Sequence, residues 1–398
     1  MSDKVIVAGV GMHRFRKPGA SEPYDVMAQT AINAALADAG LAFGHVQQAY
    51  ASYVYGDSTS GQRALYGVGR SGIPVINVNN NCASGATALF LARQAVAGGA
   101  AHCVLAFGFE QMRRGALTEH WDDRPGPLSD FIEATRAAQG WDEQVPMAAQ
   151  IFGGAGREHM RRFGTRPETF ARIAVKARRH AANNPGAVFN EPVTLEEVLA
   201  SPTIFDPLTR LQCCPPTCGA AAAVLVSPEF ARHIGLERGV AIAGQSLVTD
   251  RDESFTEGDL RWLVGYGMGI EASERAYEMA GIGPEDVDVV ELHDCFTTNE
   301  LIAYEALGLV PEGEGERMVM DGDNTYGGRV VVNPSGGLLA KGHPLGATGL
   351  AQCAELVCQL RGEAGARQVE GARIGLQHNI GLGGACVVTV FESPANDA

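Results

Sequence analysis

The sequence predicts an α/β fold in which one arrangement of strands and helices is used twice. Strands and helices alternate along the chain, and the order of elements in the first half returns in the second. The chain has 398 residues, of which 45% are hydrophobic, 19% are charged and 50 are glycines, a composition typical of tightly packed α/β layers. This length exceeds one ordinary core, so we expect two or three domains.

The first half is predicted to contain strands over 5–10, 49–55, 73–78 and 103–109, with helices over 24–39 and 83–96. The second half is predicted to contain strands over 241–248, 287–292 and 374–378, with helices over 271–280 and after His343. Each half then closes on a similar strand, GAAAAVLVS at 219–227 and GACVVTVFE at 384–392. Alternation at this spacing indicates parallel sheets covered by helices on both faces.

The spacing of the landmarks also locates an insertion. Cys82 lies 137 residues before Gly219, whereas His343 lies 41 residues before Gly384, so the first half carries about 96 more residues. We therefore expect an N-terminal half from residues 1–112 and 213–235, an inserted loop domain over 113–212, and a C-terminal half over 236–398.

The inserted segment contains the most basic part of an acidic chain. The formal charge is -15, which disfavours a general nucleic-acid or acidic-membrane partner. Between Arg157 and His180, however, eight Arg or Lys face two Asp or Glu. We expect this stretch, through Arg178 and Arg179, to bind a phosphorylated ligand; the alternative is a solvated helix face.

The nine cysteines show no paired framework and predict reduced thiols in a cytoplasmic protein. Cys213, Cys214 and Cys218 lack the second pair or His cluster of a zinc site, so we interpret them as core or site-lining thiols and expect no metal. We expect no leader peptide, since a strand begins almost at once, and no membrane span, since no apolar run reaches about 20 residues. No GxGxxG string follows a strand in the required context, so no redox cofactor is implied.

The residue that indicates chemistry is Cys82, in NNNCASG at 79–85, between a strand and a helix rich in small residues. A thiol at a helix start experiences unpaired N–H groups and the positive end of the helix dipole, so we expect its thiolate to be favoured. The alternative is a small core residue. The string GHPLGATG at 342–349 places His343 at the start of another such helix, and together they indicate a thiolate and its base.

These strings are two of six that resemble the thiolase superfamily, and within it the sterol carrier protein X type of thiolase. The six are GDSTSGQRA (56–64), INVNNNCASGATALF (76–90), ELHDCFTTNELIAYEALGL (291–309), GDNTYGG (322–328), NPSGGLLAKGHPLGATGLAQ (333–352) and LQHNIGLGGA (376–385). The resemblance runs nearly end to end. It implies two similar βαβαβαββ halves stacked as five layers, with a loop domain inserted in the first half.

The resemblance implies thiolysis of a 3-oxoacyl-CoA, with release of acetyl-CoA or propanoyl-CoA, in fatty-acid or sterol side-chain β-oxidation. Cys82 would then attack the 3-oxo carbon, and His343 would hold the proton. His293, in HDCF at 293–296, resembles the donor to the enolate oxygen. Conventional thiolases carry NEAF or NEAH there, and a second catalytic Cys in a CxG string near the C-terminus. That Cys is absent here, so Cys295 is the expected acid.

The string HNIGLGG at 378–384 stands where conventional thiolases have that CxG string. His378 is either a site residue or a structural histidine. Gly381 is expected to act through its backbone N–H, which would pair with that of Cys82 as a hole for the acyl oxyanion. A further departure is Cys218-Gly219, where close relatives have Asp-Gly.

By the same resemblance we expect coenzyme A as co-substrate with no tightly bound cofactor, acyl-CoA as partner, and a homodimer or homotetramer. Three alternatives stay open: a thiolase-fold aldolase, a ketosynthase-like condensing enzyme, and a non-catalytic protein that binds acyl-CoA or lipid. Steroid side-chain aldolases of this fold lack the nucleophilic cysteine as a group, so Cys82 argues against the first.

Overall fold

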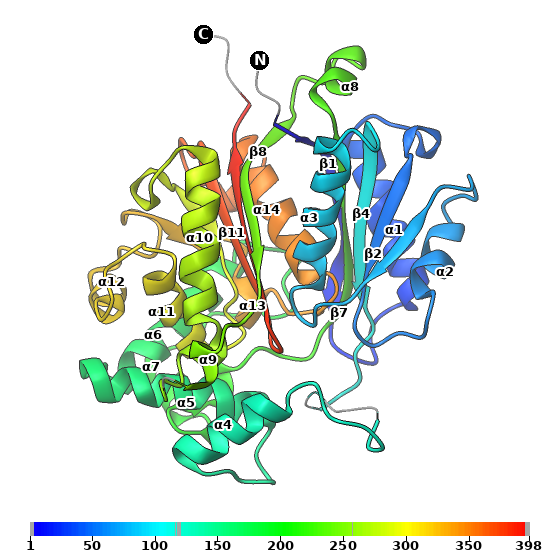
Figure 1. Ribbon diagram of the computed structural model, residues 1–398. Coiled ribbons are helices and arrows are strands. Elements are labelled where there is room, and N and C mark those ends of the chain that lie inside the picture. The colour runs from blue at the N-terminus through cyan, green and yellow to red at the C-terminus, as the bar shows by residue number, and fades with distance from the viewer. Residues whose placement is uncertain (1–3, 116, 118–120, 257, 395–398) are drawn as a thin grey trace.

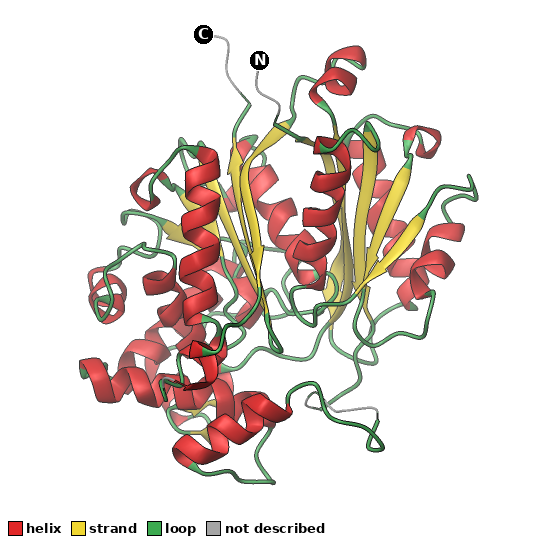
Figure 2. Cartoon of the chain, in the orientation of Figure 1, coloured by secondary structure: helices red, strands yellow, loops and turns green. Residues whose placement is uncertain are grey.

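A mixed sheet of ten strands organises the chain, in the order β10-β9-β11-β12-β8-β1-β7-β4-β2-β3 (Figures 1 and 2). The computed structural model describes residues 4–115, 117, 121–256 and 258–394. Strands β1 and β8 pair only through Ile6 with Ala241 and Val7 with Val240. This short contact divides the sheet into two five-stranded halves, each with the same order of equivalent strands, which confirms the predicted repeat.

The first half contains strands β1 (Ile6–Arg16), β2 (Gln48–Ser52), β3 (Val75–Val78), β4 (Cys103–Glu110) and β7 (Cys218–Val226). Its helices are α1 (Tyr24–Asp38), α2 (Ser60–Tyr66), α3 (Ser84–Ala97) and α8 (Pro228–His233). The strands begin and end within a few residues of the predicted ranges, except that β1 runs six residues further, to Arg16.

The second half contains strands β8 (Val240–Val248), β9 (Val289–Glu291), β10 (Val331–Val332), β11 (Ile374–Gly381) and β12 (Ala385–Glu392). Its helices are α9 (Glu253–Thr256), α10 (Tyr266–Ala280), α11 (Thr297–Ala306), α12 (Gly315–Asp321), α13 (Gly337–Ala340) and α14 (Thr348–Leu360). Helix α10 begins five residues before the predicted start.

The expectation of fully parallel sheets is wrong for one strand in each half. Strands β2, β3 and β4 are parallel to one another, as are β9, β10 and β11, but β7 runs antiparallel to both β1 and β4. Strand β12 does the same between β8 and β11. In the second half the reason is the direct hairpin from β11 to β12, which can only join antiparallel strands. In the first half β4 and β7 pair in the same antiparallel way, although the inserted segment separates them in sequence.

Helices and sheets alternate in five layers, as the resemblance implies. Helix α1 covers one outer face, α10 covers the other, and α3 and α14 lie together between the two half-sheets (Figure 1). The central contact requires glycine: a Cβ on Gly349 of α14 would lie 2.2 Å from the Ala86 nitrogen of α3, and one on Gly85 would lie 3.0 Å from the Gly346 oxygen. Every residue of β4 and β7 is buried.

The segment between β4 and β7 lies outside this sheet. It forms α4 (Ser129–Gln139), α5 (Met147–Phe163), α6 (Pro167–Ala181), α7 (Leu195–Ala200) and a small hairpin of β5 (Thr203–Phe205) and β6 (Leu208–Thr209). Although this segment interrupts the first half in sequence, α5 and α6 pack against α11, α12 and α13 of the second half (Figure 1). It therefore encloses the ends of the strands from which the site is built.

Candidate active site

Cys82 is held in a tightly bonded loop between β3 and α3. Asn81, the residue before it, has a φ of 49°, a left-handed conformation that asparagine tolerates better than most residues. The Asn81 backbone N–H donates to the Asn79 side chain at 3.0 Å, and the Asn81 side chain donates to the Leu382 carbonyl at 2.9 Å. Ser84 adds two bonds, accepting from the Asn80 N–H and donating to the Asn81 carbonyl. The loop fixes the position of the thiol.

The prediction of a favoured thiolate at Cys82 is wrong. Burial, and then the nearby Glu110 carboxyl group, raise the pKa of Cys82 to about 12. The helix begins only at Ser84, two residues later, so the dipole effect does not offset the loss of water. Before substrate binds, Cys82 is therefore a neutral thiol.

Glu110, at the end of β4, is a buried residue that the sequence reasoning did not single out. Its carboxyl group accepts the backbone N–H groups of Val54, Tyr55 and Gly346, each at 3.0 Å. It thus ties the first half to the loop that follows His343. Burial raises the pKa of Glu110 to about 7.

His343 lies in the loop between α13 and α14, and one of its ring nitrogens has no hydrogen-bond partner among the described residues. Its Nδ1 lies 2.7 Å from Thr348 Oγ1, whose own hydrogen goes to the Pro344 carbonyl at 3.0 Å. The hydroxyl therefore accepts, Nδ1 carries the hydrogen, and Nε2 keeps its lone pair. Nε2 has no hydrogen-bond partner among the described residues. Burial lowers the pKa of His343 to about 3, so it is neutral and able to accept a proton.

His293 follows β9 and has the opposite tautomer. The Asn379 amide nitrogen donates to His293 Nδ1 at 2.9 Å, which places the ring hydrogen on Nε2. Burial, with smaller effects of His343 and His378, holds the pKa of His293 well below its ordinary value. The His293 and His343 rings lie 5.0 Å apart at 86°. The two imidazoles thus offer one N–H donor and one lone pair.

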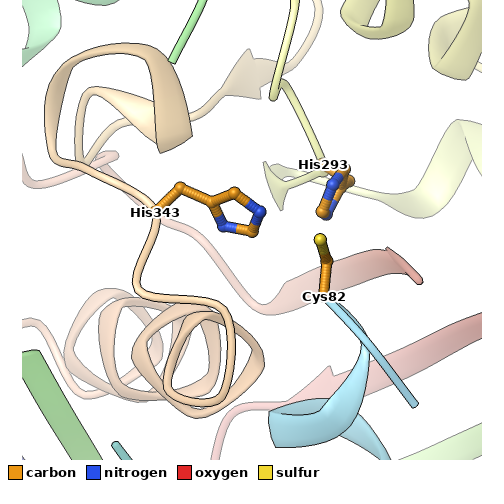
Figure 3. A group of neighbouring side chains, drawn as sticks. All are labelled: Cys82, His293 and His343. Carbon is orange, nitrogen blue, oxygen red and sulfur yellow. The ribbon is translucent and has the colours of Figure 1, made fainter. Parts of the chain in front are cut away.

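These groups converge on one pocket. Potential ligand atoms of Cys82, His293 and His343 all lie within 4.8 Å of one another, and Figure 3 shows the sulfur pointing toward the two rings. All three line a cavity of about 780 Å³. Its walls are mainly apolar, with Phe152 and Phe296 stacked at 4.9 Å between centroids. The structure brings the predicted nucleophile, base and enolate donor together.

Cys295 lines the same pocket, with Cys213 and Cys214. The Cys214 N–H donates to the Cys295 carbonyl at 2.9 Å, which holds the two segments side by side. Burial, then the neighbouring Cys214 and Cys82, raise the pKa of Cys295 well above its ordinary value, so it is a protonated thiol. Cys218 is fully buried in β7 and its thiol contacts the Met112 carbonyl.

The structure does not bring His378 into the pocket wall. Its ring lies on the other face of β11 from Asn379, beside Gly269 of α10, and neither ring nitrogen has a partner among the described residues. Gly381 instead lies against the nucleophile loop, where a Cβ would come within 2.0 Å of the Asn80 oxygen. The residue of this string that contacts a predicted site side chain is Asn379, which the sequence reasoning did not single out. The alternation of side chains along β11, which points Asn379 away from His378, was the available signal in the sequence.

We expected the basic stretch 157–180 to form a free cationic surface, but most of its charged side chains are paired with acidic residues. Its Arg and Lys side chains pair with Asp206, Glu158, Glu316, Glu168 and Glu300, and Arg179 donates to Thr325. Only Arg178 of this stretch lines the pocket, where its guanidinium lies 4.4 Å from the Phe189 ring. Exposed Lys17 lies over the same ring at 4.7 Å, and Arg210 also lines the pocket. The cationic mouth is therefore assembled from distant segments.

Comparison with known proteins agrees with this geometry. Family models match residues 5–229, described as "Thiolase, N-terminal domain", and residues 264–392, described as "Thiolase C-terminal domain-like". The chain is 54% identical to "Sterol carrier protein 2" of Rattus norvegicus, over 98% of this chain and 72% of that protein. It is 40% identical to "Acetyl-CoA acetyltransferase" of Methanothermobacter thermautotrophicus, over 81% of each.

Among solved structures, the "Ltp2-ChsH2(DUF35) aldolase" superposes with a TM-score of 0.82 at 25% identity, covering 99% of each chain. Within the described part of the chain, no helix is long and apolar enough to cross a membrane.

Proposed function

Because the chain belongs to the thiolase family, we propose that it transfers an acyl group between a 3-oxoacyl-CoA and coenzyme A through an acyl-enzyme on Cys82. The observation that carries the proposal is the convergence of a thiol, a lone-pair imidazole and an N–H imidazole on one pocket. The direction we propose is thiolytic release of acetyl-CoA or propanoyl-CoA in fatty-acid or sterol side-chain β-oxidation.

In the first step the Cys82 sulfur attacks the 3-oxo carbon and its proton passes to His343 Nε2. Both groups are neutral before substrate binds, so the proton moves as the new C–S bond forms. The negative charge then resides on the former carbonyl oxygen, where backbone N–H groups of Cys82 and Gly381 are the proposed donors. Expulsion of the substrate's enolate restores the carbonyl and leaves a thioester on Cys82.

The departing thioester enolate needs a donor at oxygen and a proton at carbon. His293 Nε2–H supplies the donor, since Asn379 occupies Nδ1. We assign the carbon proton to Cys295, which carries its proton at neutral pH. Coenzyme A then attacks the Cys82 thioester, its thiol proton returns through the same groups, and the shortened acyl-CoA leaves with the Cys82 thiol restored.

Arg178 and Arg210 at the pocket, with Lys17 nearby, are the proposed binding groups for the coenzyme A phosphates. Arg178→Ala should raise the KM for coenzyme A, and the increase should shrink as salt is added. Arg179→Ala is the matched control, because that side chain donates to Thr325 and does not line the pocket. Equal effects of the two substitutions would contradict the assignment of Arg178.

The decisive experiment for the whole proposal is peptide mapping after incubation with a 3-oxoacyl-CoA in the absence of free coenzyme A. We expect an acyl group on Cys82 alone. Release of acetyl-CoA from acetoacetyl-CoA plus coenzyme A is the companion assay. An adduct on a different cysteine would refute the assigned nucleophile, and acetyl-CoA release without any adduct would refute the covalent route.

The role of Cys295 is tested separately. Cys295→Ala should lower kcat by about 10²–10⁴-fold, the usual contribution of one acid–base group, while Cys82 is still alkylated by iodoacetamide. Cys386→Ala is the control, since Cys386 is fully buried in β12 and should leave turnover nearly unchanged. Near-normal turnover of Cys295→Ala would remove Cys295 from the mechanism.

An aldolase is the second candidate, because the "Ltp2-ChsH2(DUF35) aldolase" shares the fold over nearly the whole chain. Aldol cleavage of a 3-hydroxyacyl-CoA yields a carbonyl product and needs no acyl-enzyme. Turnover of a 3-hydroxyacyl-CoA that survives in Cys82→Ala would favour this candidate over thiolysis.

We also propose a cytoplasmic homodimer or homotetramer. Light scattering on the purified protein measures the assembly state, and a monomer at micromolar concentration would contradict it.

A further inference from the structure

The same three side chains that would carry acyl transfer also match the ligand set of a metal centre. We propose that Cys82, His293 and His343 bind a divalent ion of the Zn²⁺ type, and that a bound ion blocks acylation of Cys82. A thiolate sulfur and two imidazole nitrogens are typical zinc ligands, and a site with three protein ligands keeps one position open. This goes beyond the proposed function, which requires no metal.

The geometry is close to that of such a centre. The three ligand atoms lie within 4.8 Å of one another. Tetrahedral coordination with ordinary zinc bond lengths requires separations of about 3.3–3.6 Å. Side-chain rotations that close these gaps by about 1 Å are therefore sufficient. The cavity of about 780 Å³ lies over the cluster and leaves the fourth position to water or to an incoming thiol.

The protonation states also suit a cation. His343 Nε2 already presents its lone pair and has no partner among the described residues. His293 must move its hydrogen from Nε2 to Nδ1, which Asn379 permits, since its amide oxygen is also without a partner among those residues. Rotation of the Asn379 side-chain amide would let its oxygen accept the hydrogen on His293 Nδ1. Metal-bound imidazoles commonly donate their second N–H to such an acceptor.

The reaction balances without any redox step. The Cys82 S–H bond breaks, a sulfur–metal bond forms, and one proton leaves to solvent for each ion bound. A bound ion occupies the nucleophile and the lone pair of its base together, which is why we expect inhibition.

Cobalt(II) provides a direct measurement on the resting protein in thiol-free buffer, without substrate. We expect one Co²⁺ per chain, with a thiolate-to-cobalt charge-transfer absorption that Zn²⁺ abolishes by displacement. Zn²⁺ should also protect Cys82 from iodoacetamide. Because no turnover is measured, loss of the proposed thiolase function would leave this result unaffected.

Cys82→Ser should abolish the charge-transfer absorption and weaken Co²⁺ binding by at least about 100-fold. This loss exceeds the usual effect of removing a residue that only hydrogen-bonds to a metal ligand. His293→Gln is a second variant that retains the thiol, and should weaken binding while leaving the absorption weak but present. Cys213→Ser is the matched control, a pocket thiol outside the cluster, and should bind as the native chain does. Unchanged absorption in Cys82→Ser, or no saturable binding at micromolar metal in the native chain, would overturn the proposal.

Discussion

The ionisation of Cys82 gives a sharp test of how the site generates its nucleophile. A pKa of about 12 leaves about one Cys82 in 10⁵ ionised at pH 7. Burial also lowers the pKa of His343 to about 3, so neither group is charged before substrate binds. Alkylation of Cys82 then depends on the small fraction of free thiolate, which follows the hydroxide concentration.

The assay is the rate of alkylation of Cys82 by iodoacetamide, followed by peptide mass mapping between pH 7 and pH 10. We expect a rise of about tenfold per pH unit, or about 1,000-fold in all, with no plateau. A thiol with an ordinary pKa of about 8.5 would rise only about 30-fold and then level off, and free cysteine in parallel reactions supplies that reference.

A plateau near neutral pH would refute the reasoning, because it would mean that a thiolate is present before substrate arrives. Burial penalises the charged form of Cys82, so the raised pKa moves its ionisation to higher pH. Mapping by peptide separates Cys82 from the other eight cysteines, and the Cys82→Ala variant gives the background.

Three further predictions test the supporting structure. Lys176→Met should lower the free energy of unfolding by about 3–5 kcal/mol in urea titrations, because it strands buried Glu300, whereas Arg172→Met, at an exposed helix pair, should cost less than about 1 kcal/mol. Gly381→Ala should cut kcat and also lower the unfolding midpoint, because the new Cβ would lie 2.0 Å from the Asn80 backbone oxygen and the nucleophile loop would have to move; normal kcat would argue against that contact. Asn379→Leu should lower kcat by about 10²-fold with KM nearly unchanged, by releasing the His293 tautomer, and a pure KM effect would contradict this role.

The features that the sequence predicted correctly are those encoded in local strings. The repeat was recoverable because each strand and helix carries its own period, and Cys82 and His343 were singled out because each precedes a helix rich in small residues. The five-layer thiolase fold is confirmed on that basis together with the resemblance.

The predictions that failed depend on residues far away in the chain. The Cys82 pKa is set by burial and by Glu110, which only the folded chain brings near. The basic stretch 157–180 is neutralised in part by Glu300 and Glu316, more than 100 residues later. Asn379 was overlooked because alternation along the strand shows only that His378 and Asn379 lie on opposite faces, and the contact of Asn379 with His293, 86 residues earlier, appears only in the folded chain.

The close contact between α3 and α14, at Gly85 and Gly349, joins the two halves of the chain that supply the site. The Cys82 thiol belongs to the first half, whereas both imidazoles belong to the second, so neither half alone holds all three side chains. The proposed acyl transfer therefore requires the two halves to stay docked along α3 and α14. We expect a fragment that contains only one half to show no acyl transfer, because it lacks either the thiol or both imidazoles.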